Sequence, residues 1–96
     1  MLLTLDIGNT SITIGLFNGE KLDSIKRIPS NIHYSINDYK ELLTETIESD
    51  CIDSCIIASV VNGLDKILYD TILLTFGIES IILSPNIDIG IKLKLK

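Results

Sequence analysis

The chain begins with MLLTLDIGNTS (residues 1–11), in which a short apolar run meets a polar turn. Residues Leu2–Asp6 form the run, which is typical of a β-strand, and Gly8–Ser11 are residue types that favour turns. Beyond them Ile12, Ile14 and Leu16 recur at every second position, as in a strand with one buried face. This opening stretch therefore predicts a β-hairpin.

A second hairpin signal follows at Asn18-Gly19, since both residues tolerate the positive φ that tight hairpin turns require. Alternation over residues 22–27 then predicts another strand. Three antiparallel strands are therefore expected to open the protein.

The next segments predict a helix and a buried strand. Ser35 and Asp38 have the spacing of a helix capping box, and apolar residues then recur at helical spacing, which predicts a first helix from about Ile36 to Ser49. Residues Ile52–Val61 are mostly apolar and rich in β-branched side chains. This pattern predicts a strand covered on both faces, inside the sheet and parallel to a neighbour.

A second helix and further strands complete the predicted order. Asn62 is expected to cap the helix, an apolar stripe to pack it, and Gly77 to end it. Residues 80–83 read as the last core strand, and residues 88–96 alternate like a half-exposed strand. The core elements are therefore expected in the order β-β-β-α-β-α-β.

Length, composition and charge limit which classes of protein this chain can belong to. The 96 residues are 46% hydrophobic, enough for one compact domain and richer in apolar side chains than a soluble monomer needs. Part of the apolar surface is therefore expected to meet another surface. The net charge is −5, and the basic residues are scattered except at Lys92, Lys94 and Lys96, which disfavours nucleic acid as a partner.

Membrane and export signals are weak. The longest apolar candidate, Ile67–Leu83, is interrupted by Asp70, Gly77 and Glu79. The first five residues lack a basic leader and meet a carboxylate at once, unlike a secretory signal. These patterns predict a cytoplasmic protein with no membrane partner.

The cysteines are expected to be structural. Cys51 and Cys55 form a lone C-x3-C pair, and His33 is the only histidine, so a zinc site would be short of ligands. We expect two reduced thiols, with Cys55 packed inside a strand.

The first turn carries the candidate chemistry. Asp6 is expected to end the first strand, where a buried or half-buried carboxylate costs free energy unless it has a hydrogen bond, a charge partner or a metal ion; a magnesium-bound nucleotide would meet that need. Gly8 allows close approach of a phosphate, and the N–H groups of Gly8, Asn9 and Thr10 can form an anion-binding nest. The structural alternative is that Asp6 and Asn9 only stabilise the turn through side-chain to backbone bonds.

These residues resemble a known family. Leu5–Thr10, followed by Ile14–Phe17, resembles the first phosphate motif of the type III pantothenate kinases, within the actin-like ATPase and sugar kinase superfamily. The other segments that resemble the family are Asp38-Tyr39 with Leu42-Leu43, Ala58–Val61, Ile82–Ile87 and Gly90–Lys92. The resemblance therefore covers essentially the whole chain.

Four positions depart from the family pattern. Asn62 stands where the family usually has proline, Asn86 where it has glycine and Ile89 where it has threonine. Thr13 stands where some relatives carry a lysine within reach of a phosphate. Together these departures indicate a diverged member.

The resemblance implies an α/β fold: one actin-like (ribonuclease H-like) amino-terminal domain over residues 1–96, with a mixed sheet flanked by helices. It implies transfer of the γ-phosphoryl group of ATP to the terminal hydroxyl of pantothenate, the first committed step of coenzyme A synthesis, with Mg²⁺ and a monovalent cation (K⁺ or NH₄⁺). Asp6 is expected to orient the magnesium ion and the phosphates, and Gly8, Asn9 and Thr10 to cradle the phosphates.

The catalytic base is expected to lie outside this chain. The sequence stops before the family's Asp-Asn-Pro segment, before the Gly-Ala-Asp-Arg motif that carries the base, and before the second domain with the adenosine and pantothenate contacts. No catalytic residue is therefore expected within residues 1–96, and the chain alone is expected to lack pantothenate kinase activity.

Two other functions stay open: a stand-alone, non-catalytic actin-like binding or regulatory module, and a different actin-like enzyme such as a sugar or acetate kinase. Asn9 weighs against the second, because those families more often place threonine or serine there. A homodimer is also expected, because the alternating tail of residues 89–95 would leave an apolar strand edge that exchange between chains could cover.

Overall fold

The computed structural model describes residues 1–47 and 51–83 of the chain. Its elements follow the predicted order β-β-β-α-β-α-β. The strands are β1 (Leu2–Ile7), β2 (Ser11–Asn18), β3 (Lys21–Pro29), β4 (Ser54–Ser59) and β5 (Ile81–Leu83), and the helices are α1 (Ile36–Thr46) and α2 (Leu64–Phe76).

The strands form one mixed sheet in the order β3-β2-β1-β4-β5. β1 pairs antiparallel with β2, and β2 with β3, whereas β1, β4 and β5 run parallel to one another. The prediction of a mixed sheet that begins with three antiparallel strands is confirmed. β4 lies inside the sheet and parallel to its neighbours, as its sequence predicted.

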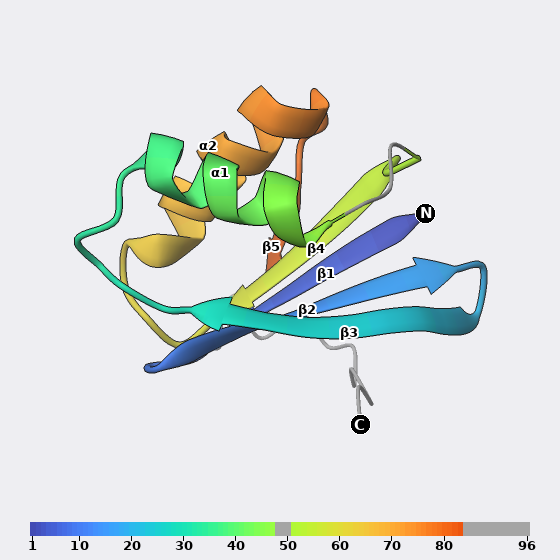
Figure 1. Cartoon of the computed structure of the whole chain (residues 1–96), viewed down its shortest axis with the longest axis horizontal. Helices are drawn as coiled ribbons and strands as arrows, with labels where there is room; N and C mark the ends of the chain where they lie inside the picture. The colour runs from blue at the N-terminus through green and yellow to red at the C-terminus, as the bar shows by residue number, and fades with distance from the viewer. Residues whose placement is uncertain (48–50, 84–96) are drawn as a thin grey trace.

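Both helices pack on the same face of the sheet (Figure 1). The strand residues that face them are fully buried in alternation, which is the period-two pattern of a half-covered sheet. Burying each such aliphatic side chain contributes about 1.5–3 kcal/mol to folding. The fully buried side chains of this core include Leu3, Leu5, Ile7, Ile12, Ile14 and Ile57 from the strands and Tyr39, Leu43, Leu64, Leu68 and Ile72 from the helices.

The opposite surface, here called the helix-free face, carries one row of paired residues that crosses all five strands: Ile25, Gly15, Thr4, Ile56 and Ile81. Its outer members are exposed, Ile25 to 59% and Ile81 to 61%. No helix in the described part of the chain packs on this side, where Ile56 and Ala58 of β4 are half-buried, so a helix covers only one of the two faces predicted to be covered. An apolar run shows that a strand is buried, but it does not show on which faces.

The helix ends agree in part with the sequence. The capping box is present, since Ser35 Oγ accepts from the Asp38 N–H at 3.2 Å and the Asp38 carboxylate accepts from the Ser35 N–H at 2.9 Å. α1 ends earlier than expected, at Thr46, and the expected end at Ser49 lies outside the described residues. Gly77 ends α2 in the left-handed conformation, as predicted.

Two local predictions were wrong. The tight turn between β2 and β3 consists of Gly19-Glu20, because Asn18 is still paired in β2. Only Gly19 has a positive φ, and glycine in the first central position is the pattern of type II′ turns. The N-cap of α2 is Gly63 and not Asn62, and no side chain caps this helix.

Neither described helix has the length and apolar character that crossing a bilayer requires. The strand predicted for residues 88–96 lies outside the described residues.

Candidate functional site

The candidate site is the turn that joins β1 to β2. The Gly8 N–H donates to the Ser11 carbonyl at 2.9 Å, so Asn9 and Thr10 form a two-residue connection. Gly8 does not have a positive φ, and its value to the turn is its small size. A Cβ at this position would lie 3.3 Å from the Ser11 carbonyl oxygen, so the carbonyl would have to move. The turn is therefore closed by backbone and leaves its side chains outside.

Neighbouring strands hold the turn from two sides. The Val60 N–H, just after β4, donates to the Ile7 carbonyl at 3.1 Å, and the Ser30 N–H, just after β3, donates to the Thr10 carbonyl at 3.1 Å. The turn thus lies at the carboxyl end of the parallel strands β1 and β4. Ligands of open α/β sheets bind outside this end of the strands.

The structure brings the predicted phosphate-binding residues into one short, accessible segment. Asp6, Asn9 and Thr10 are exposed and Gly8 is half-buried. Asp6 is paired with Thr13 and Ala58, which places it on the helix-free face at the end of β1. The expectation that the Asp6 carboxylate is buried or half-buried is wrong, because its side chain lies on the sheet face that no described helix covers.

The polar groups of this segment are largely unused by the fold. In residues 1–47 and 51–83, no hydrogen bond or ion pair involves the side chain of Asp6, Asn9 or Thr10. The N–H groups of Asn9 and Thr10 likewise lack partners within this described part, whereas that of Gly8 is engaged by Ser11. The structural alternative, in which Asp6 and Asn9 stabilise the turn through side-chain bonds, is therefore not what the geometry shows.

The donor set suits a hard cation held jointly with phosphate. Within the described ranges, no group of three or more His, Cys, Asp or Glu side chains could hold a metal ion by itself. Magnesium is commonly held by one or two carboxylates together with phosphate oxygens and water. Asp6, exposed and unpaired, fits that mode as a single protein carboxylate beside the turn.

The two cysteines lie in different environments. Cys55 is buried in β4, as predicted, and burial raises its pKa to about 11. Cys51 is exposed, and neither cysteine forms a disulfide. The buried thiol therefore stays protonated at neutral pH and is a packing group of the core.

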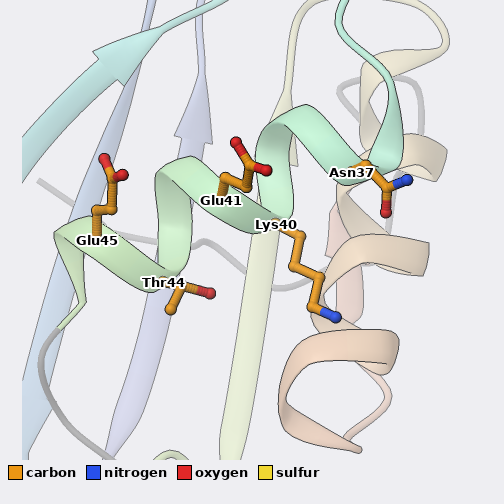
Figure 2. Close-up of a pocket in the computed structure, with 5 residues that line it drawn as sticks. All are labelled: Asn37, Lys40, Glu41, Thr44 and Glu45. Atoms are coloured by element: carbon orange, nitrogen blue, oxygen red, sulfur yellow. The ribbon is translucent and has the colours of Figure 1, made fainter.

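A surface hollow of about 470 Å³ lies on α1, lined by Asn37, Lys40, Glu41, Thr44 and Glu45. Figure 2 shows that Glu41 and Glu45 point to one side of the helix, and that Asn37, Lys40 and Thr44 point elsewhere. The five side chains do not converge on one point, and none belongs to the turn. The hollow is part of the solvated surface of the helix.

Sequence reasoning missed the two residues that hold the turn, Ser30 and Val60. Both act through their backbone N–H groups, which every residue except proline carries. No side-chain pattern marks them. Only the register of the strands shows that they reach the turn.

The whole chain resembles proteins of one known family. The family described as "Type III pantothenate kinase" matches residues 2–96. Two proteins named type III pantothenate kinase, from Agathobacter rectalis and Geobacter sulfurreducens, are 34% and 31% identical to this chain. These matches cover 97% and 98% of this chain but 38% and 39% of the relatives, so the chain spans well under half of their length.

Among solved structures, the chain is similar to the Aquifex aeolicus member of the Ppx/GppA family, with a TM-score of 0.40 and 14% sequence identity. The match covers 88% of this chain and 35% of that structure.

Proposed function

The chain belongs to the type III pantothenate kinase family, and from this premise we propose that its β1–β2 turn binds the phosphates of ATP together with Mg²⁺. Residues 1–96 then form the amino-terminal, phosphate-binding part of a kinase that phosphorylates pantothenate. The length of the curated relatives, of which this chain covers about 38%, supports its assignment as one part of a larger enzyme.

One observation carries the proposal: the polar groups of the turn are exposed and have no partner in the described fold. The Asp6 carboxylate and the N–H groups of Asn9 and Thr10 lie in one segment five residues long. Because these groups are exposed and the fold does not use them, they are free to exchange hydrating water for a ligand. Their availability favours an external partner that accepts hydrogen bonds and carries a metal ion.

Each residue has a distinct part in the proposal. The N–H groups of Asn9 and Thr10, with their side chains, donate hydrogen bonds to phosphate oxygens, and Gly8 keeps the backbone open to close approach. Asp6 holds the magnesium ion beside them. Bound Mg²⁺ supplies neutralisation of the charge on the phosphates, which is a large share of catalysis in phosphoryl transfer.

We further propose that the isolated chain does not turn over pantothenate. Asp53 pairs with the amino terminus at 3.3 Å. Asp23 lies near the start of β3, close to the β2–β3 turn and at the far end of this strand pair from the β1–β2 turn. The proposal assigns the one carboxylate beside the turn, Asp6, to the magnesium ion, so it leaves neither Asp53 nor Asp23 nor Asp6 to act as the base for a substrate hydroxyl. An assay of pantothenate-dependent ADP formation checks this. Steady turnover that disappears in Asp6→Ala would contradict it.

The remaining parts of the proposal follow from the family. They are pantothenate as the substrate of the full-length enzyme, a monovalent cation (K⁺ or NH₄⁺) as a second ion, a homodimer as the assembly, and the cytoplasm as the location.

Asp6→Asn tests the phosphate role. The change removes a charge and keeps the shape of an exposed, unpaired side chain, so we expect an unchanged melting temperature and a dissociation constant for magnesium-ATP that rises about tenfold. Calorimetric titration measures the affinity. Asp23→Asn, an exposed aspartate on β3, is the matched control and should bind like the wild type. Equal affinities for both variants would show that Asp6 has no part in binding.

A further inference from the structure

Tyr39 of α1 is fully buried, and its hydroxyl forms hydrogen bonds with a single loop residue, Asn31. The hydroxyl accepts from the Asn31 N–H at 2.9 Å and donates to the Asn31 carbonyl at 3.0 Å. Its ring packs edge-on against that of Tyr34, with centroids 5.3 Å apart. Both backbone groups of Asn31 are therefore fixed by one side chain from the core.

Asn31 organises the loop that joins β3 to α1. Its carbonyl also accepts from the Tyr34 N–H at 3.1 Å, and its side-chain oxygen accepts from the His33 N–H at 2.9 Å. The residue before it, Ser30, donates to the Thr10 carbonyl at 3.1 Å. A continuous path of hydrogen bonds and one peptide link thus joins the Tyr39 hydroxyl to the β1–β2 turn.

We propose that the Tyr39 hydroxyl is a positioning group for this turn: by fixing Asn31 it keeps the Ser30 N–H on the Thr10 carbonyl and so orients the Asn9-Thr10 segment. The coupling between Tyr39 and the turn stands on the described hydrogen bonds alone. Its consequence for ligand affinity rests on the proposed phosphate-binding function.

The hydroxyl is suited to a fixed structural bond. Burial raises the pKa of Tyr39 above the usual value of a tyrosine, so the group keeps its proton and remains a donor through the physiological range. A phenylalanine would preserve the ring packing but leave the part-buried Asn31 N–H without its partner, and the loss of a satisfied hydrogen bond is costly.

Tyr34 supplies a matched control. Its ring is the one that packs against Tyr39, yet its own hydroxyl makes no hydrogen bond in the described part of the chain. Tyr34→Phe therefore removes a hydroxyl of the same kind without touching the path to Thr10. Comparing Tyr39→Phe with Tyr34→Phe separates the hydrogen bonds from ring packing.

The first measurement needs no ligand. Hydrogen exchange of the Ser30 amide, taken relative to the Leu5 amide in the core, reports the bond to Thr10 directly. In Tyr39→Phe we expect this relative exchange rate to rise roughly tenfold, since the loss of one satisfied hydrogen bond is of that order. Tyr34→Phe should match the wild type. An unchanged Ser30 rate in Tyr39→Phe would overturn the coupling.

The second measurement is a titration with magnesium-ATP. In Tyr39→Phe we expect the dissociation constant to rise roughly three- to tenfold, and in Tyr34→Phe to stay the same. An unchanged constant in Tyr39→Phe would show that the path does not position the turn for binding. If the wild type itself fails to bind, the proposed function fails, while the Ser30 exchange still decides the coupling.

Ser30→Pro provides a second variant if Tyr39→Phe folds poorly. It deletes the N–H donor itself, and the residue before it, Pro29, already has the extended strand conformation that precedes a proline. We expect the same rise in the dissociation constant as in Tyr39→Phe. Wild-type affinity in Ser30→Pro would overturn the positioning role.

Discussion

At the scale of single residues, the turn divides its work between backbone and side chains. Backbone groups of Gly8, Ile7 and Thr10 take up the bonds that close and hold the turn. The side chains of Asp6 and Asn9 take no part in them within the described residues. A change of side chain at these two positions should therefore affect binding without affecting folding.

Cys55 gives a residue-scale prediction about pH. Burial raises the pKa of its thiol from 9.0 to about 11, so the folded state holds this proton more tightly than the unfolded state. The resulting stability, of order 2–3 kcal/mol, is present below pH 9 and is lost as the pH rises toward 11. Urea unfolding across this range measures it.

Cys55→Ala is the control for that prediction, because it removes the titrating group and leaves the other groups of the core in place. The free energy of unfolding of this variant should fall less steeply over the same pH range. Parallel pH profiles for wild type and variant would contradict the account.

At the scale of elements, the sequence predicted what is local and missed what depends on tertiary contacts. Periodicity and the capping box located the strands and the first helix, because both arise from neighbours along the chain. The choice of Gly63 over Asn62 as N-cap, and the packing of both described helices on one side of β4, depend on how the elements meet. The order and the turn were therefore predictable, and the contacts of Ser30 with the turn were not.

Gly15 gives an element-scale prediction about the sheet. A Cβ there would lie 2.6 Å from the Thr4 Oγ1 across the β1–β2 pair, closer than atoms can approach. Gly15→Ala should therefore destabilise the protein by about 1–3 kcal/mol. In a Thr4→Ala background the cost should shrink, because the blocking oxygen is gone. Additivity within about 0.5 kcal/mol in the double-mutant cycle would contradict this reason.

At the scale of the whole molecule, the two faces of the sheet differ in kind. One is sealed by both helices, and the other presents exposed apolar side chains at Leu22, Ile25 and Ile81 within the described residues. Apolar surface of this kind commonly marks an interaction site. The tail of residues 89–95, whose exchange between chains was expected, lies outside the described part. The exposed apolar side chains of the helix-free face are a second reason to expect a dimer.

Sedimentation across a wide range of concentrations tests association. We expect reversible self-association that Ile25→Lys weakens, because a charge placed on the helix-free face opposes its burial. Leu74→Lys is the matched control, since Leu74 is equally exposed, at 59%, but lies on α2. A monomer at every concentration, or equal effects of the two substitutions, would show that this face does not carry the contact.

Whether the β1–β2 turn holds phosphates is tested most directly by amide NMR of the wild-type chain during titration with magnesium-ATP. The N–H groups of Asn9 and Thr10 are the unpaired donors of the turn, so their signals should move most, and saturably, with smaller shifts at Gly8. Signals of the buried strand interior, such as Leu5, should stay in place. If the Asn9 and Thr10 signals do not move at saturating magnesium-ATP, the turn is structural and the proposed function is wrong.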